Sequence, residues 1–202
     1  MKSFTLKGPI KIEGIGLHTG VKTNVILNPA PLKSGIFFNR TDKSTIIPAK
    51  WDNVISTKFS TNIASNGVEV KTVEHLLSAL AGLHINNCEI FIDNLEVPIL
   101  DGSSNVFVES ILKKGIKEQD SEQKILEIVK PVKFSCDYGY AELAPNSPKD
   151  EGLNINLESS FEGKYEDQDI KIKNLNGNYI ESISKARTFG FFQEIEYLKS
   201  QN

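Results

Sequence analysis

Two adjacent residues, Glu74 and His75, have the side chains that metal-dependent hydrolysis needs. They stand in the segment "KTVEHLLSAL", where the apolar residues repeat at the spacing of one helix stripe. That stripe consists of Val73, Leu76, Leu77, Leu80 and Leu83. A carboxylate can act as a general base, and a neighbouring imidazole can bind a metal ion. Such a pair is more often an ordinary surface pair, and the two-histidine HExxH pattern is absent. The helix alone leaves both interpretations open.

The face of this helix that carries the pair has an unusual composition. At about 100° per residue, Glu74 and His75 fall beside the apolar stripe, away from its centre. Their neighbours on that side are small: Ser78, Ala79, Ala81 and Gly82. A solvated helix face would normally carry long charged side chains. We therefore expect a second domain or a substrate to pack against this face, with the pair at the interface.

Three further segments hold residues that could serve a site. "GIGLHTG" places His18 at the tip of a glycine turn, but no Lys-Ser/Thr follows, so it is not a phosphate loop. "VPILDGSS" joins a proline turn to Asp101 and to a serine that would cap the next helix. "KARTFGFF" sets Thr188 among phenylalanines. Taken singly, a turn, a loop and a buried strand explain most of these features.

Length and composition limit the class of protein. The chain has 202 residues, which fits one large domain or two small ones. It is 39% hydrophobic and 24% charged, as in ordinary globular proteins. A net charge of −3 gives no basic surface for nucleic acid. No apolar run reaches the roughly 20 residues that span a bilayer, and the N-terminus does not resemble a secretory signal. We expect a cytoplasmic protein without nucleic-acid partners or transmembrane segments.

Two rare residue types carry expectations of their own. Cys88 and Cys136 lie far apart without CxxC spacing, so we expect reduced core thiols and no disulfide or zinc ribbon. Arg40 and Arg187 are the two arginines in a chain that otherwise uses lysine as its cation. A retained arginine suggests a need for its planar fork, although chance would also explain two such positions.

The order of predicted elements favours the α+β class. Loosely alternating stretches predict strands before the helix at 73–83, with "SNG" as a hairpin turn. A strand over "NNCEIFIDN" and a helix that ends before Gly115 follow. The charged run 116–124 reads as a linker. Strand-like runs then dominate, including "DIKIKNLNGNYI". Because strands and helices are segregated, we expect α+β domains at 1–115 and 125–202.

Taken together and in order, five segments closely resemble the UDP-3-O-acyl-N-acetylglucosamine deacetylase family. They are "GIGLHTG", "NRTD", "TVEHLLSALAGL", "NNCEIFIDNLEVPILDGSS" and "SKARTFGFFQEIEYL", and the resemblance runs from about residue 4 to 198. The family consists of zinc amidohydrolases that commit Gram-negative bacteria to the biosynthesis of lipid A, the lipid of lipopolysaccharide. The resemblance implies two similar domains, each a small sheet layered with helices, with the active site between them. It also implies Zn²⁺ as cofactor and UDP-3-O-acyl-N-acetylglucosamine as substrate.

The resemblance gives catalytic roles to three residues. It implies that His75 is a zinc ligand and that Glu74 is the general base. Zinc activates water, the neighbouring carboxylate accepts the proton, and the N-acetyl carbonyl is attacked. The tetrahedral oxyanion needs a hydrogen-bond donor besides zinc, and the resemblance implies the Thr188 hydroxyl for this role.

The resemblance also implies residues that bind the substrate. Phe189 and Phe191 would contact it near the glucosamine and the entrance for the acyl chain. His18 and Asp101 lie in motifs near the site, and we expect them to contact substrate as well.

The chain departs from the family in its donor set. The resemblance implies that a later histidine and an aspartate complete the zinc site, and that another histidine is the general acid, all after position 202. His84 cannot replace them easily, because it lies about 13 Å from His75 along a continuous helix, whereas ligands of one zinc lie within roughly 4 Å of each other. We expect the N-terminal two-thirds of a deacetylase with an incomplete second domain, inactive alone. A C-terminal segment on another chain is one way to complete it. The alternative is a non-catalytic module that binds a sugar nucleotide or assembles with a partner.

Overall fold

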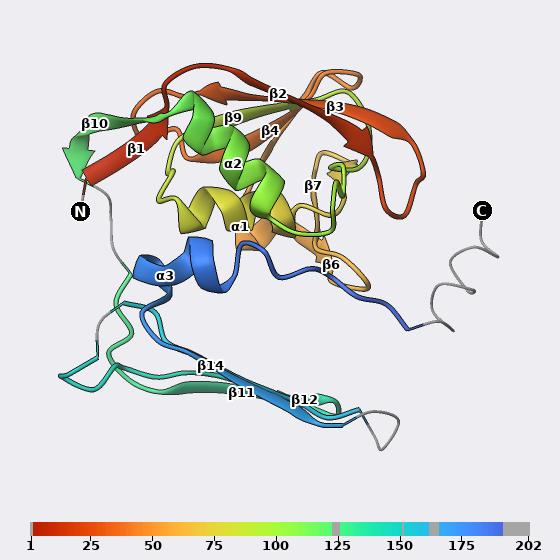
Figure 1. Ribbon diagram of the computed structural model, residues 1–202. Helices are drawn as coiled ribbons and strands as arrows, with labels where there is room; N and C mark the ends of the chain where they lie inside the picture. Colours follow the sequence, from red (N-terminus) through yellow and green to blue (C-terminus); the bar gives the residue numbers. More distant parts are fainter. Residues whose placement is uncertain (1, 123–125, 151, 162–165, 192–202) are drawn as a thin grey trace.

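The computed structural model describes residues 2–122, 126–150, 152–161 and 166–191. Its larger part is a curved sheet with two helices packed on one face (Figure 1). The main sheet has five strands in the order β2-β3-β9-β4-β5, and only β4 and β9 run parallel to each other. Their bounds are β2 Ile10–Ile15, β3 Lys22–Pro29, β4 Ile36–Arg40, β5 Thr45–Pro48 and β9 Cys88–Ile92.

A smaller antiparallel sheet lies beside the main one. It contains β6 (Val54–Ser56), β7 (Asn62–Ser65) and β8 (Val68–Val70), and it follows the short helix η1 (Trp51–Asn53). Asn66 and Gly67 join β7 to β8 with φ values of 51° and 75°. Two successive left-handed residues suit the twist of a tight hairpin, so the turn predicted from "SNG" is confirmed.

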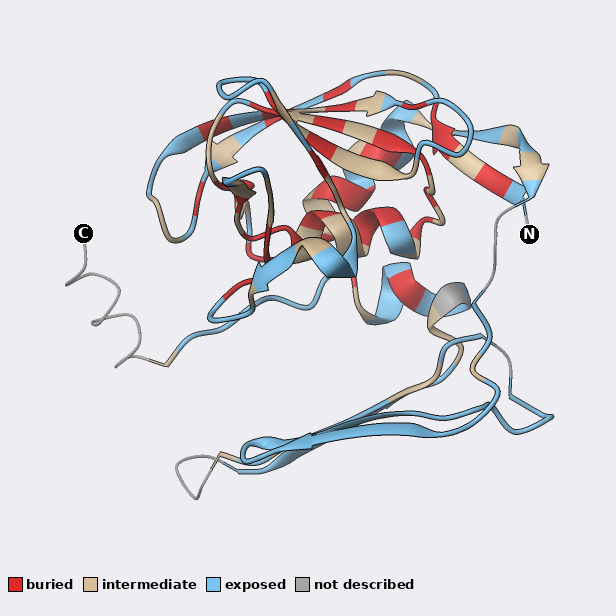
Figure 2. Ribbon diagram, turned by 180° about the vertical axis from the view of Figure 1, so that it is seen from behind, coloured by how far each residue is buried: buried red, intermediate tan, exposed pale blue. Residues whose placement is uncertain are grey.

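Helices α1 (Glu74–Gly82) and α2 (Asn105–Lys114) cover one face of the main sheet. The predicted apolar stripe of α1 is buried in the core, with Leu77 partly buried. At the start of α2, Ser103 Oγ accepts a hydrogen bond from Asn105 N at 3.0 Å, and the helix ends at Gly115 with a φ of 94°. Figure 2 shows the buried residues concentrated between this sheet and its helices.

The charged run 116–124 was predicted to be a linker, but its residues 116–122 are not one. They form strand β10 (Ile116–Glu122), which pairs antiparallel with β1 (Lys2–Leu6). The sequence prediction was wrong here because a strand at the edge of a fold exposes most of its side chains, so charge does not exclude pairing. Residues 116–122 therefore pair with the N-terminal strand, and the division into domains stays a prediction.

Among its described residues, the second half of the chain contains two hairpins and a helix. Strand β11 (Val132–Cys136) pairs with β12 (Gly139–Leu143), and β13 (Ile155–Ser159) pairs with β14 (Gln168–Ile172). Helix α3 (Leu175–Ser182) follows, where the sequence predicted a strand. The strand prediction failed because Tyr179 is buried against α1 in a helical segment, a tertiary contact that local propensity does not contain.

The two cysteines are free thiols, as predicted, but only one belongs to the core. Cys88 is buried in β9, and burial raises the pKa of its thiol to about 12. Cys136 is exposed at the end of β11, so the prediction of a core position was wrong for it. All described residues of the β11–β12 hairpin are exposed, and the alternation in sequence did not reveal that.

The fold class is α+β, as the element order predicted. Within the described ranges, no helix is both long and apolar enough to cross a membrane.

Candidate active site

Glu74 and His75 form the first two residues of α1, where the helix emerges from β8 and its following loop. Glu74 Oε2 accepts a hydrogen bond from Thr61 N at 2.9 Å, and both Glu74 and His75 are half-buried. A carboxylate is favourable at a helix N-terminus because the dipole presents partial positive charge there. The pair is therefore held at one end of a helix and is open to a ligand.

Ser78 and Gly82 of the small-residue face of α1 pack against α3. The Ser78 Oγ and Tyr179 hydroxyl lie 2.8 Å apart in a hydrogen bond, and Tyr179 is 4% exposed. A Cβ at Gly82 would overlap the Tyr179 ring, so only glycine permits this approach. The prediction that an element packs on this face is confirmed, and that element comes from the second half of the chain.

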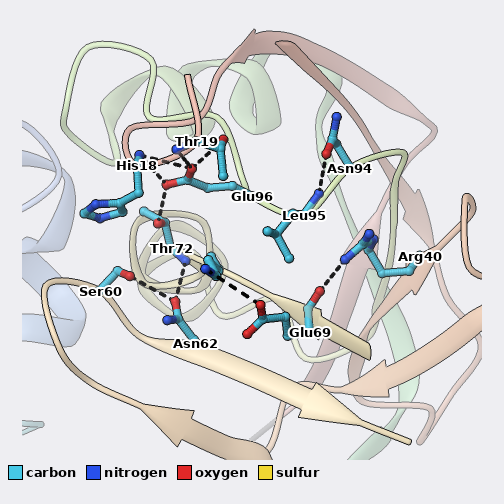
Figure 3. Close-up of polar contacts among 11 residues, drawn as sticks. His18, Thr19, Arg40, Ser60, Asn62, Glu69, Thr72, Asn94, Leu95 and Glu96 are labelled. Atoms are coloured by element: carbon cyan, nitrogen blue, oxygen red, sulfur yellow. Dashed lines mark hydrogen bonds and ion pairs between the residues drawn. The ribbon is translucent and has the colours of Figure 1, made fainter. Parts of the chain in front are cut away.

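A buried carboxylate, Glu96, joins the glycine turn to the segment that enters α1 (Figure 3). Its oxygens accept hydrogen bonds from His18 N (3.0 and 3.1 Å) and from Thr19 N and Oγ1 (each 2.8 Å). On the other side, Thr72 Oγ1 donates at 2.7 Å. Burial by itself would raise the pKa of Glu96, but the hydrogen bonds from His18, Thr72 and Thr19 outweigh it and lower the pKa. Glu96 is therefore ionised at neutral pH.

His18 lies in this turn with its imidazole directed away from Glu96 (Figure 3). The residue is half-buried, and its Nε2 is buried without a hydrogen-bond partner among the described residues. A buried ring nitrogen without a partner is costly, and such atoms often await a ligand or water. The substrate-contacting role of His18 stays a prediction.

Thr188 contacts the loop before α2 that also carries Asp101. Asp101 Oδ1 accepts hydrogen bonds from Ser103 N (3.1 Å) and Ser103 Oγ (2.8 Å). Gly102 has a φ of 82°, and its carbonyl accepts a hydrogen bond from Thr188 N at 2.8 Å. A Cβ at Gly102 would lie 3.6 Å from Thr188 Cγ2. The structure thus brings the "ARTFG" segment onto the Asp101 loop, although about 85 residues separate them.

Phe189 and Phe191 belong to an aromatic cluster with Phe161. Their ring centroids lie 6.4 Å (Phe161 to Phe189), 6.0 Å (Phe161 to Phe191) and 5.6 Å (Phe189 to Phe191) apart, all edge to face. Phe189 is 73% exposed. An exposed aromatic surface beside Thr188 is available to an apolar group.

The arginines differ. Arg40 is buried and forms the expected fork: Nε and Nη2 donate to the two oxygens of Asp42 at 2.8 and 2.7 Å, and Nη1 donates to the Glu69 carbonyl. Arg187 is exposed, and its Nε lies 3.8 Å from where a Cβ at Gly102 would be. Arg40 is thus structural, since it joins β4 to β8.

The described residues offer some, but not all, of the side chains that a zinc site needs. Among the residues that the structure describes, no three His, Cys, Asp or Glu side chains gather closely enough to hold a metal ion. His84 follows α1 with a φ of 57° and donates its backbone N–H to Ala81 O at 3.0 Å, so it lies just after the end of the helix. One imidazole beside one carboxylate suits zinc chemically but does not complete a site.

Sequence reasoning missed Glu96, Thr72 and Tyr179. Glu96 stands alone in the apolar run "LEVPIL", and an isolated charge among apolar residues is a signal of a paired, buried group. Thr72 gives no such signal, because its hydroxyl acquires a role only through contact with Glu96. Tyr179 gives none either, because its role depends on α1.

A family model and individual relatives that match this chain carry the same enzyme name. A family model described as "LpxC: UDP-3-O-acyl N-acetylglycosamine deacetylase" matches residues 3–202. The UDP-3-O-acyl-N-acetylglucosamine deacetylase of Nautilia profundicola is 42% identical over 200 residues, which cover 99% of this chain and 68% of that protein. The proteins of the same name from Hahella chejuensis and Psychrobacter arcticus are each 40% identical over 207 residues, covering 67% and 63% of their lengths. The chain therefore spans about two thirds of these relatives.

Proposed function

Because the chain belongs to the UDP-3-O-acyl-N-acetylglucosamine deacetylase family, we propose that it carries the general base and one zinc ligand of such an enzyme. The reaction is hydrolysis of the N-acetyl group of UDP-3-O-acyl-N-acetylglucosamine, the committed step of lipid A biosynthesis. The observation that carries this proposal is the Glu74-His75 pair at the N-terminus of α1, in a chain whose residues 3–202 match the family model.

Glu74 accepts the proton of the attacking water. Thr61 N–H holds its Oε2 at 2.9 Å, and Oε1 makes no hydrogen bond to a described residue. One oxygen therefore fixes the orientation of the carboxylate while the other is available to accept a proton. Position within hydrogen-bond reach of the water is the main requirement for a general base.

Among the described residues, His75 is the one that would hold zinc. Zinc, when bound, supplies Lewis-acid activation of water and stabilises negative charge on the carbonyl oxygen. A catalytic zinc normally has three protein ligands, and the described residues offer one in this place. The other ligands are therefore assigned to residues outside those described, on this chain or another.

The remaining site residues recognise the substrate. Thr188, which is held on the Asp101–Gly102 loop, offers its hydroxyl to the developing oxyanion. Phe189 and Phe191 present apolar edges to the acylated sugar. The unpartnered His18 Nε2 and the exposed Asp101 are polar groups suited to contacts with the sugar nucleotide.

The test is acetate release from UDP-3-O-acyl-N-acetylglucosamine by the complete protein that the open reading frame encodes, with metal analysis of the same sample. Glu74→Ala should retain zinc and lower kcat by about 10²–10⁴-fold, the range for general acid–base catalysis. Glu13→Ala removes an exposed carboxylate, paired with Lys22, and should leave kcat unchanged. Full activity in Glu74→Ala would remove the base assignment. A zinc-loaded complete protein that binds the sugar nucleotide without acetate release would favour the non-catalytic module.

A second measurement concerns the 202 residues by themselves. Since the residues that the structure describes offer one zinc ligand, the isolated chain should bind zinc weakly and release no acetate. One tightly bound zinc per chain together with turnover would show that the ligands are assigned wrongly.

A further inference from the structure

Glu96 is surrounded by donors alone. Both of its oxygens are engaged: Oε1 accepts from His18 N and Thr72 Oγ1, and Oε2 accepts from His18 N, Thr19 N and Thr19 Oγ1. The residue is fully buried. A carboxylate can satisfy donors on both of its oxygens, whereas an amide would turn its NH₂ group toward one set of donors. The site is therefore built for a carboxylate and not merely for a polar residue.

The backbone on the His18 side is shaped around this carboxylate. A Cβ at Gly16 would overlap both Glu96 Oε2 and Thr19 Oγ1, so the turn approaches Glu96 as closely as a glycine allows. The turn closes on itself, since Gly20 N donates to Gly16 O at 3.0 Å. Glu96 thus determines where the turn that carries the His18 imidazole lies.

The backbone on the α1 side is also tied to Glu96. Thr72 adopts a φ of 57°, which a β-branched residue rarely does, and its N–H donates to Asn62 Oδ1 at 3.2 Å. Lys71 N donates to Leu95 O at 2.9 Å, and Val97 N donates to Lys71 O at 3.1 Å. The connection into Glu74 and His75 is therefore held in a strained conformation by the segment that contains Glu96.

We propose that Glu96 is a positioning residue for the active site, acting through Thr72 on Glu74 and His75 and through the turn on His18. This inference rests on the proposed function. One buried carboxylate connects residues that lie more than fifty positions apart in the chain and that carry different parts of the proposed chemistry. Groups that orient catalytic or metal-binding residues change activity by about 10–100-fold when they are removed.

The experiment compares Glu96→Gln, Thr72→Val and the double variant in the complete, zinc-loaded protein. Glu96→Gln should lower kcat by about 10–100-fold with a smaller change in KM. Thr72→Val keeps the branched shape of the side chain and loses the hydroxyl, so it should also lower kcat, as Glu96→Gln does. If Glu96 acts through Thr72, the double variant should lose no more than Glu96→Gln alone, because interacting residues are not additive.

Two variants separate positioning from general stability. Thr72→Ser keeps the hydroxyl and should keep most of kcat. Glu89→Gln makes the same chemical change on β9, where Oε1 accepts one hydrogen bond from Asn39 Nδ2 at 3.3 Å, and should leave kcat and KM unchanged. If Glu96→Gln fails to fold, the comparison of Thr72→Val with Thr72→Ser decides the question. Equal kcat in that pair, or fully additive losses in the double variant, would overturn the proposal.

Hydrogen exchange distinguishes failure of this inference from failure of the proposed function. If the complete wild-type protein releases no acetate, the proposed function fails. The amides of His18, Thr19 and the first turn of α1 should still exchange faster in Glu96→Gln than in the wild type. Unchanged exchange in both segments would show that Glu96 does not hold them.

Discussion

At the scale of single residues, the environment separates the roles of two glutamates near α1. Glu74 is half-buried and accepts one hydrogen bond from Thr61, whereas Glu96 is fully buried among donors. A carboxylate with all of its acceptor positions occupied is a poor proton acceptor, because protonation would cost those hydrogen bonds. Glu96 is therefore suited to holding structure, and Glu74 to accepting a proton.

The first prediction concerns acid. Because the pKa of Glu96 is lowered in the folded protein, its stabilising effect is present above its ordinary pKa of 4.5 and disappears as the pH falls through its lower native value. Glu96→Gln should reduce the free energy of unfolding by about 1–3 kcal/mol at pH 7. That deficit should shrink below about pH 4. Urea unfolding of both proteins at several pH values measures it, and a deficit that grows in acid would contradict the assignment.

The second prediction concerns Thr188 and its aromatic neighbour. Loss of one oxyanion donor costs roughly 2.7–4 kcal/mol in the transition state, so Thr188→Val should mainly lower kcat of the complete enzyme. Thr188→Ser keeps the hydroxyl and is the matched control. Phe191→Ala removes apolar contact and should instead raise KM for the acylated substrate. If Thr188→Val and Phe191→Ala both changed KM alone, Thr188 would be a binding residue.

Sequence could identify residues whose chemistry is local and missed those whose role depends on the fold. The Glu74-His75 pair and the glycine turn of His18 were visible as motifs. Thr72 was not, because a threonine hydroxyl has no distinctive pattern until a buried acceptor lies 2.7 Å away. Glu96 differs, because an isolated charge in the apolar run "LEVPIL" is a signal of a buried group, but its partners His18, Thr19 and Thr72 became known only from the structure.

At the scale of elements, the local sequence pattern predicted the helices of the first half. It did not predict elements whose structure depends on strand pairing or on packing against another element. The stripe of α1 and the Gly115 stop of α2 follow from periodicity and a left-handed C-terminal residue. Strand β10 and helix α3 do not follow from local pattern. The first depends on β1 as a partner and the second on the surface of α1.

The third prediction concerns the connection between the two sheets of the first half. Arg40 is 4% exposed and joins Asp42 with two hydrogen bonds and the Glu69 carbonyl with a third. Hydrogen bonding by Arg40 also lowers the pKa of Asp42. Lysine cannot reproduce this fork, so Arg40→Lys should lower the free energy of unfolding by about 1–3 kcal/mol.

Arg187→Lys is the control at an exposed position, and it should change the free energy of unfolding by less than about 0.5 kcal/mol. Chemical denaturation measures both, and equal stability of the two variants would contradict the role of Arg40.

At the scale of the whole molecule, the halves of the chain meet where α3 packs on α1 and where the Thr188 segment reaches Gly102. Figure 2 shows that the hairpins of the second half are largely exposed, in contrast to the buried region between sheet and helices. The small residues of α1 made such a contact predictable, but not the identity of the element. Ser78, which contacts Tyr179 of α3, lies one helical turn after Glu74 on α1. Docking of the second half and the geometry of the site are therefore physically connected.

The last prediction tests that connection. A Cβ at Gly82 would overlap the Tyr179 ring, so Gly82→Ala should displace α3. Alanine favours a helix over glycine by about 1 kcal/mol, whereas overpacking costs typically 1–3 kcal/mol, so the net effect should be local loosening and not global unfolding. Amides of α3 should exchange faster in Gly82→Ala while those of β3 and β9 stay protected.

Tyr179→Phe loses the hydrogen bond to Ser78 and should have a smaller effect. It should lower the free energy of opening of α3 by about 1 kcal/mol. Ala81 belongs to the same small-residue face but is exposed, so Ala81→Ser should leave exchange of α3 unaltered. Equal protection of α3 in Gly82→Ala and the wild type would mean that α3 is not held on α1 by this contact.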